Sequence, residues 1–227
     1  MQRRDLVVAI DGPSGSGKST VAREVATALD LRYLDTGAMY RAVTWLALQR
    51  GVALGAADQL ADLAAHAELT VTTDPAAPAI VANGTDVTAE VRTPAVTSAV
   101  SEVSAVPGVR AAMVARQREI IGAGGIVVEG RDIGSTVAPD AAVKVFLTAD
   151  AATRAQRRAR QDGITELPVA LESTEADLRR RDIADSTRVA SPLQEAPDAL
   201  VLDSSGLDID RVVAIIVERA LEAAVPR

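Results

Sequence analysis

The chain has 227 residues, of which 48% are hydrophobic and 24% charged, a composition that excludes bulk disorder and favours one core with an insertion over two full domains. The absence of cysteine excludes disulfides, thiolate zinc sites and cysteine nucleophiles, and no apolar run is long enough to predict a membrane span. Because 31 acidic side chains outnumber 24 basic ones, the net charge of −7 argues against general nucleic-acid binding, which needs a basic face.

The first predicted elements are a strand, a glycine-rich turn and a helix. Residues 6–10 form a continuous apolar run that ends in Asp-Gly-Pro, which is typical of a buried parallel strand. Residues 18–29 carry apolar side chains at helical spacing, so the order is that of the first half of a βαβ unit. The residues before the strand lack the apolar stretch of a signal peptide, and we therefore expect a cytoplasmic protein.

The turn at residues 12–19 matches the phosphate-binding pattern G-x-x-x-x-G-K-[ST] of a P-loop. Its glycines let successive backbone N–H groups face a phosphate, and the helix N-terminus adds its positive dipole end. Lys18 would reach the β and γ phosphates of a nucleotide, and the Ser19 hydroxyl would bind Mg²⁺. A P-loop predicts a nucleoside triphosphate but not the reaction, so a phosphotransferase and a GTPase- or ATPase-type switch both remain. The lack of an Asn-Lys-x-Asp guanine signature favours the phosphotransferase.

The middle of the chain combines helices with a small β insert. Helical periodicity predicts helices at residues 38–50, 56–66, 94–104 and 107–121. Short β-prone pieces predict an antiparallel insert at about residues 68–90. Within it, Asn83-Gly84 is a strong signal for a hairpin turn.

The rest of the chain alternates strands with helices. Apolar runs predict strands at residues 125–129, 143–147 and 199–202. Helices are predicted at residues 150–161, 173–184 and 208–224, and the first two bracket a polar loop at 161–168. This alternation predicts the α/β class, with a doubly wound parallel sheet and helices on both of its faces.

A phosphotransferase also needs a second anionic pocket, and three stretches are candidates for it. Thr36 opens a helix with Arg41 one turn later, although Thr36 could be an ordinary N-cap. Arg131-Asp132 follows a buried strand, at the sheet edge where ligands bind. Residues 181, 185 and 188 would share one helix face, whereas Arg179 and Arg180 are expected on a solvated, salt-bridged face.

The predicted helix at 150–161 is rich in arginine. Its basic side chains are Arg154, Arg157, Arg158 and Arg160. No acidic residue lies between them, so no partner in the same stretch neutralises them. They favour an anion as the partner, and a merely solvated helix is the alternative.

Together these motifs resemble those of the bacterial cytidylate kinases, a branch of the nucleoside monophosphate kinases. The resemblance is carried by residues 10–19, 34–41, 129–132, 181–188 and 191–193. It runs from about residue 5 to the last helix and implies one P-loop kinase domain over residues 1–227. The core of that domain would be about 1–60, 105–150 and 195–227, with a monophosphate-binding insert region at about 61–104 and a lid at about 154–190.

The resemblance also implies a role for each candidate residue. ATP would be bound by Gly12, Pro13, Ser14, Gly15, Ser16, Gly17, Lys18, Ser19 and Thr20, with its adenine near the loop Ser204-Ser205-Gly206, where Ser205 is the expected ligand. The CMP phosphate would meet Thr36, Arg41, Arg131 and Arg188, the cytosine Ser101, Arg110 and Asp132, and the ribose Arg181 and Asp185. The catalytic cations would be Lys18, Arg131, Arg188 and Arg157, the last belonging to the lid, and Mg²⁺ would bind Ser19 together with ATP phosphates and water.

The reaction that the resemblance implies is transfer of the γ-phosphoryl group of ATP to CMP or dCMP, in pyrimidine nucleotide metabolism. Its nucleophile would be an anionic phosphate oxygen that needs no general base, in agreement with a chain that has one histidine and no cysteine. The expected partners are ATP and CMP or dCMP, without nucleic acid or membrane, and we expect a monomer. The alternatives are a kinase for UMP, AMP or a metabolite alcohol, the last with Asp35 or Asp132 as base, and a P-loop ATPase or switch.

Overall fold

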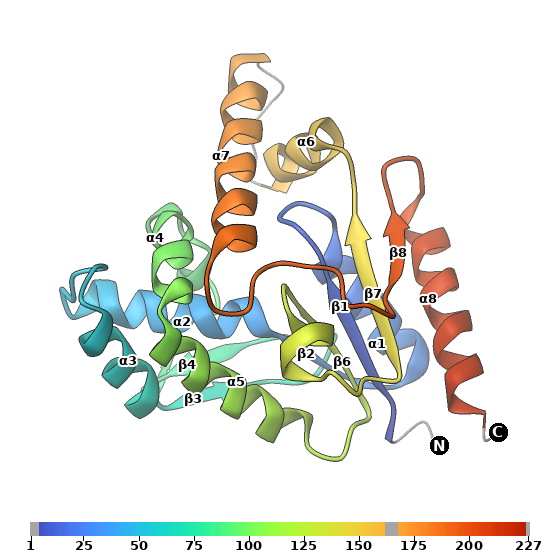
Figure 1. Ribbon diagram of the computed structural model, residues 1–227, viewed down its shortest axis with the longest axis horizontal. Coiled ribbons are helices and arrows are strands. Elements are labelled where there is room, and N and C mark those ends of the chain that lie inside the picture. Colours follow the sequence, from blue (N-terminus) through green and yellow to red (C-terminus); the bar gives the residue numbers. More distant parts are fainter. Residues whose placement is uncertain (1–4, 162–167, 226–227) are drawn as a thin grey trace.

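The computed structural model describes residues 5–161 and 168–225, and at its centre is a parallel sheet (Figure 1). The five strands are β1 (Val7–Asp11), β2 (Arg32–Asp35), β6 (Ile126–Gly130), β7 (Val143–Thr148) and β8 (Leu200–Asp203). Their order across the sheet is β2-β6-β1-β7-β8, and each neighbouring pair is parallel. The carboxyl ends of all five strands therefore meet at one edge, where ligands bind in open α/β sheets.

Helices cover both faces of this sheet. They are α1 (Lys18–Leu29), α2 (Thr36–Gln49), α3 (Ala57–His66), α4 (Pro94–Ala105), α5 (Pro107–Ile121), α6 (Ala151–Gln161), α7 (Pro168–Thr187) and α8 (Ile209–Ala224). Val8 and Ile10 of β1 pack with residues of α1 and α8, whereas Ala9 between them packs with residues of α2 to α5. This alternation follows from the period of two along a strand, and it confirms the predicted doubly wound α/β fold.

Strand β2 is the one strand of the central sheet that the sequence did not predict. Only Tyr33 and Leu34 at its centre are buried, and it begins with a charged residue. Arg32 satisfies backbone carbonyls of the neighbouring α5 end, donating to Ile120 at 2.8 Å and Ile121 at 2.9 Å. Arg32 breaks the apolar pattern that predicts a buried strand. Its partner lies 88 residues away, so the nearby sequence does not show that its charge is satisfied.

The predicted antiparallel insert is confirmed. Its strands are β3 (Leu69–Val71), β4 (Ile80–Ala82) and β5 (Thr85–Asp86), in that order across a small sheet. Asn83 and Gly84 form the two-residue turn with φ of 46° and 79°, as a tight hairpin requires. The insert packs on α2 and leads through the short 3₁₀ helix η2 (Glu90–Arg92) into α4.

Helices α6 and α7 pack on each other beyond the carboxyl edge of the sheet (Figure 1). Helix α7 begins at Pro168 and ends at Thr187, so it is longer at both ends than the predicted helix at 173–184. Most of the predicted polar loop, residues 162–167, lies outside the described residues. Among the helices of the described ranges, none is long and apolar enough to cross a membrane.

Candidate active site

A cavity of about 580 Å³ opens at the carboxyl edge of the sheet, between the P-loop, α2, α4 and α7. Most of the predicted site residues line it: Ser14, Gly15, Ser16, Gly17, Lys18, Ser19, Thr20, Thr36, Arg41, Ser101, Arg110, Arg131, Asp132, Arg157, Arg181, Asp185 and Arg188. Gly12, Pro13 and Ser205 do not line it. Residues from the P-loop, α2, α4, α5, the turn after β6, α6 and the end of α7 thus meet around one space.

The P-loop joins β1 to α1, as its pattern predicts. Gly15 and Gly17 have φ of 78° and 91°, a left-handed conformation that glycine adopts without strain. The preceding Gly12 lies so close to β7 that a Cβ atom there would be 2.0 Å from the Leu147 carbonyl oxygen. The chain can therefore take this path only with glycine at position 12.

Lys18 is the first residue of α1, and its side chain folds back into the P-loop. Its Nζ donates to the Pro13 carbonyl at 2.7 Å and to the Ser16 hydroxyl at 3.5 Å. Burial, together with the nearby charge of Arg131, lowers the pKa of Lys18. An anion between Lys18 and Arg131 would oppose both effects, because it would favour the charged form of each side chain.

The Ser19 hydroxyl donates to Glu129 Oε2 at 3.0 Å, and the Tyr33 hydroxyl donates to Oε1 of the same carboxylate. Burial raises the pKa of Glu129, and the nearby Asp35 carboxylate raises it further. Sequence reasoning did not assign a role to Glu129, although an acidic residue that ends an apolar strand next to the P-loop strand was the available signal. The oxygens of Ser19, Glu129 and Asp35 fit Mg²⁺, a hard cation that prefers oxygen ligands and keeps several waters.

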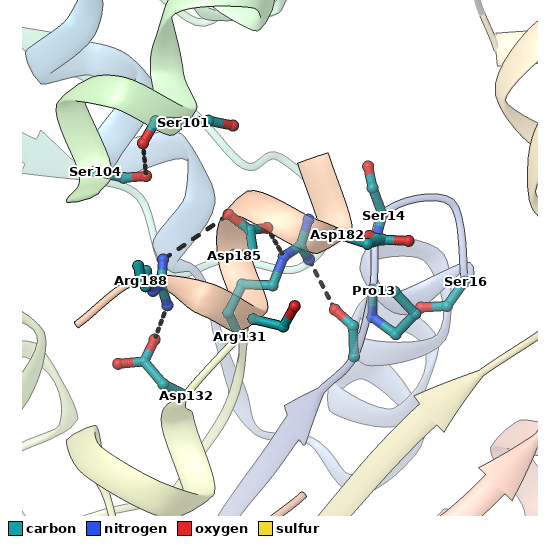
Figure 2. Close-up of polar contacts among 12 residues, drawn as sticks. Pro13, Ser14, Ser16, Ser101, Ser104, Arg131, Asp132, Asp182, Asp185 and Arg188 are labelled. Atoms are coloured by element: carbon teal, nitrogen blue, oxygen red, sulfur yellow. Dashed lines mark hydrogen bonds and ion pairs between the residues drawn. The ribbon is translucent and has the colours of Figure 1, made fainter. Parts of the chain in front are cut away.

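Asp132 lies on the side of the cavity away from the P-loop, where Arg188 faces it (Figure 2). It forms ion pairs with Arg110 of α5 and, at 3.4 Å, with Arg188. All three side chains are at most 5% exposed. The guanidinium group of Arg110 also lies 5.3 Å from the centre of the Tyr40 ring, a cation–π distance. Because arginines hold the Asp132 carboxylate from both sides, its position is fixed.

A chain of ion pairs connects this carboxylate to the P-loop (Figure 2). Arg188 Nη1 lies 3.9 Å from Asp185 Oδ1, and Asp185 Oδ2 accepts from Arg131 Nε at 2.8 Å. Arg131 Nη1 in turn donates to the Gly12 carbonyl at 2.8 Å. Arg131 is the dominant charge that lowers the pKa of Asp185, against the upward effect of burial. Arg181, Asp185 and Arg188 all line the cavity as predicted, although Arg188 lies one residue beyond the end of α7 and not on the helix itself.

Asp11, the last residue of β1, fixes the segment that follows Asp132. Its carboxylate accepts the backbone N–H groups of Ile133 and Gly134, both at 2.8 Å. Burial raises the pKa of Asp11 to about 6, and these two hydrogen bonds oppose that rise. The strand that begins the P-loop thus also positions the loop that carries Arg131 and Asp132.

Three further candidates lie along α2 and α4. The Thr36 hydroxyl donates to the Glu129 carbonyl at 2.7 Å, which fixes its side chain at the cavity wall. Arg41 Nη1 donates to Thr97 Oγ1 at 2.9 Å, which ties α2 to α4. Ser101 lines the cavity, and its carbonyl accepts from the Ser104 hydroxyl at 3.2 Å (Figure 2).

The arginines of α6 divide into two groups. Arg157 donates to the Ser16 carbonyl at 3.2 Å and to the Ser204 carbonyl at 2.8 Å, so it joins the P-loop to the end of β8. Arg154 does not line the cavity and forms an ion pair with Asp182 of α7. As predicted, the partner of Arg154 does not come from its own stretch, but the neighbouring helix α7 supplies one, so Arg154 is not left for an anion.

Asp182 of α7 links α6 to the P-loop, a contact that sequence reasoning missed. Besides pairing with Arg154, it accepts the Ser14 backbone N–H at 3.2 Å. Arg179 and Arg180 form exposed pairs with Glu175 and Asp177, as predicted for a solvated face.

Of the loop at residues 204–206 expected near adenine, Ser204 lines the cavity and Ser205 does not. Ser204 is buried, lines the cavity and contacts Arg157. Ser205 instead donates to Asp203 at 2.6 Å and accepts the Asp150 backbone N–H at 2.8 Å. The apolar side chains of Leu207, Ile209 and Val212 continue the lining beside Ser204.

Comparisons with known proteins agree with this arrangement. The family model described as cytidylate kinase matches residues 8–222. A bifunctional pantoate ligase/cytidylate kinase of Synechococcus sp. (strain JA-3-3Ab) is 55% identical over 208 residues, which are 90% of this chain but only 38% of that protein. The cytidylate kinase of Rhodococcus jostii (strain RHA1) is 51% identical over 214 residues, which are 94% of this chain and 93% of that protein.

A solved structure also resembles the chain in its fold. An uncharacterized protein from Eubacterium ventriosum ATCC 27560 superposes with a TM-score of 0.52 at 13% sequence identity, covering 95% of this chain and 98% of that one. At that identity the likeness concerns the fold alone. The family assignment rests on the match over most of the chain and on relatives of similar length at about half identity. The chain belongs to the cytidylate kinase family.

Proposed function

We propose that the chain transfers the γ-phosphoryl group of ATP to CMP or dCMP, giving CDP or dCDP. The observation that carries this proposal is the line of contacts from the P-loop carbonyl of Gly12 through Arg131, Asp185 and Arg188 to Asp132. It joins the P-loop to the Asp132 carboxylate within one cavity, with arginines between them, which supports a donor site that faces an acceptor site. A switch protein would need only the first of these two sites.

ATP would occupy the side of the cavity formed by the P-loop. Lys18 and the backbone N–H groups at the start of α1 would bind its phosphates. Arg157, which already contacts the P-loop carbonyl of Ser16, would reach the same phosphates from α6. The adenine would lie against the apolar lining of Leu207, Ile209 and Val212 rather than on Ser205.

CMP would occupy the other side, between α2, α5 and α7. Its phosphate would meet Thr36, Arg41, Arg131 and Arg188, its ribose Arg181 and Asp185, and its base Ser101, Arg110 and Asp132. Arginine suits the phosphate because its planar fork binds two oxygens at once. Asp132 would accept a hydrogen bond from the exocyclic amine of cytosine, where uracil has a carbonyl that would face the carboxylate unfavourably.

The chemistry needs positioning and charge neutralisation more than proton transfer. The attacking phosphate oxygen is already anionic, so the residues must bring two anions together and stabilise the charge of the transferring group. Lys18, Arg131, Arg157 and Arg188 would supply most of that stabilisation. Mg²⁺ would bind Ser19 close to the Glu129 and Asp35 carboxylates. It would neutralise negative charge on the ATP phosphates.

We propose that α6 and α7, within the predicted lid at about 154–190, cover the phosphates and exclude water during transfer. The contacts of Asp182 and Arg157 with the P-loop support this role, because they join both helices to the donor site. All the proposed ligands come from one chain, so a monomer would suffice. The proposed substrates are soluble nucleotides, and we place the activity in the cytoplasm.

Phosphoryl transfer can be separated from hydrolysis by following the γ-phosphate itself. ATP labelled in the γ position is mixed with the protein, Mg²⁺ and CMP, and the products are separated. We expect the label in CDP in a one-to-one ratio with ADP, because water is excluded from the closed site. Label that appears as inorganic phosphate at the same rate with and without CMP would identify an ATPase or switch instead.

A further inference from the structure

Arg92 lines the same cavity, but none of the roles assigned above uses it. It is the last residue of η2, where the insert returns to the core. Its side chain is 54% exposed, and its Nη2 lies 3.5 Å from Asp35 Oδ2. A single, exposed ion pair at that distance contributes little to stability, so Arg92 can exchange this partner for a stronger one.

The backbone of η2 is attached to a proposed phosphate ligand. Arg41 Nη1 donates to the Val91 carbonyl at 3.3 Å as well as to Thr97 Oγ1. Val91 itself is buried, at 1% exposure, and fixes η2 against the core. The Arg92 side chain therefore starts from a backbone position next to Arg41, and the two guanidinium groups are held on the same wall of the cavity.

Positive charge converges on this wall. Burial lowers the pKa of Arg41 to about 10, and the guanidinium groups of Arg181, Arg158 and Arg92 act in the same direction. Of the four neighbouring charges that act most strongly on Arg41 among the described residues, Asp35 alone opposes them. A phosphate dianion placed here would relieve repulsion between cations as well as gain hydrogen bonds.

We propose that Arg92 is a further ligand of the acceptor phosphate. In this structure the Arg92 side chain pairs with Asp35, and it moves to the phosphate when the nucleoside monophosphate enters the cavity. The move leaves the start of α2 intact, because Asp35 caps that helix through Oδ1, which accepts the Ala38 N–H at 2.9 Å. Arg92 would thus connect the position of the insert to occupation of the acceptor site. This inference rests on the proposed function, since it assumes a phosphate acceptor.

The test compares CMP with cytidine, which lacks the phosphate. Binding of each to Arg92→Gln, Arg92→Lys and the unmodified protein is measured by calorimetry or by the fluorescence of Trp45, the only tryptophan, which lies in α2 with Arg41. We expect Arg92→Gln to weaken CMP binding about tenfold and to leave cytidine binding unchanged, as for the loss of one charged hydrogen bond. Arg92→Lys should fall between, because lysine keeps the charge without the fork.

The matched control is Arg116→Gln, at a half-buried arginine of α5 that lies outside the cavity and donates to the Ala65 carbonyl at 3.0 Å. We expect it to change neither affinity. The inference is overturned if Arg92→Gln leaves CMP binding unchanged, or if CMP and cytidine weaken by the same factor, which would indicate damage to the insert. An unmodified protein that binds CMP no better than cytidine would overturn the proposed function together with this inference.

Discussion

Replacing Lys18 with alanine is expected to lower kcat for phosphoryl transfer by about 10³-fold. Lys18 is the buried cation at the centre of the P-loop, and no other side chain there could take its place as a slim point charge. Its contacts are with its own loop, so the fold should survive. The rate is measured as ADP formed with saturating ATP, Mg²⁺ and CMP, and the fold by circular dichroism.

The chain offers a matched control, because it has only one other lysine. Lys144 binds Asp198, with both Nζ–carboxylate distances at 2.9 Å, and lies outside the cavity. Lys144→Ala should leave kcat nearly unchanged and lose only some stability. Normal turnover by Lys18→Ala would show that the assignment of the P-loop lysine is wrong.

Replacing Asp132 with alanine is expected to remove the preference for CMP over UMP. The carboxylate is the proposed acceptor for the cytosine amine, and it is also the partner of two buried arginines. We therefore expect kcat/KM for CMP to fall by about 10²- to 10³-fold, and that for UMP to fall much less. Loss of the buried partner should also lower the free energy of unfolding by roughly 3–5 kcal/mol.

The ratio of kcat/KM for CMP to that for UMP separates these two effects. Both values scale with the amount of folded enzyme, so partial unfolding cancels in the ratio. Asp132→Asn, which keeps the shape, should shift the ratio in the same direction with a smaller loss of stability. Asp177→Asn on the exposed face of α7 is the control and should leave the ratio alone. An unchanged ratio in Asp132→Ala would reject the proposed role of Asp132.

The sequence predicted β1, β6 and β7 because their side chains are buried or half-buried on both faces of the sheet. β1, β6 and β7 are apolar runs that each contain one charged residue, Asp11, Glu129 and Lys144 respectively. β2 was missed because Arg32 is satisfied by carbonyls from the end of α5, a contact between distant parts of the chain. The spacing of apolar residues predicts which side chains are buried, but it does not predict which distant group pairs with a polar side chain.

The candidate site divides in the same way. Motif spacing named the residues around the cavity, since the P-loop and the Arg131-Asp132 turn have local signatures. The partners that hold them, Glu129 for Ser19 and Asp182 for Ser14, lie 110 and 168 residues away, so the sequence does not show which residues they contact. The choice between Ser204 and Ser205 depends on which of two adjacent side chains faces inward, and only the fold decides that.

The net charge of −7 gave a misleading picture of the site until the fold was known. The stretch at 51–90 is acidic and contains no lysine or arginine, but none of its residues lines the cavity. The lining instead gathers guanidinium groups from α2, η2, α5, α6 and α7. An acidic protein can therefore hold a strongly cationic pocket for two nucleotides.

The central claim is that one cavity joins ATP to a cytidine monophosphate acceptor. The most direct test is the initial rate of ADP formation from ATP and Mg²⁺ with CMP, dCMP, UMP, AMP, a panel of metabolite alcohols, or no acceptor. We expect rapid turnover with CMP or dCMP, slower turnover with UMP and AMP, none with the alcohols, and almost none without an acceptor. Equal rates with and without CMP, or a clear preference for a different acceptor, would contradict it.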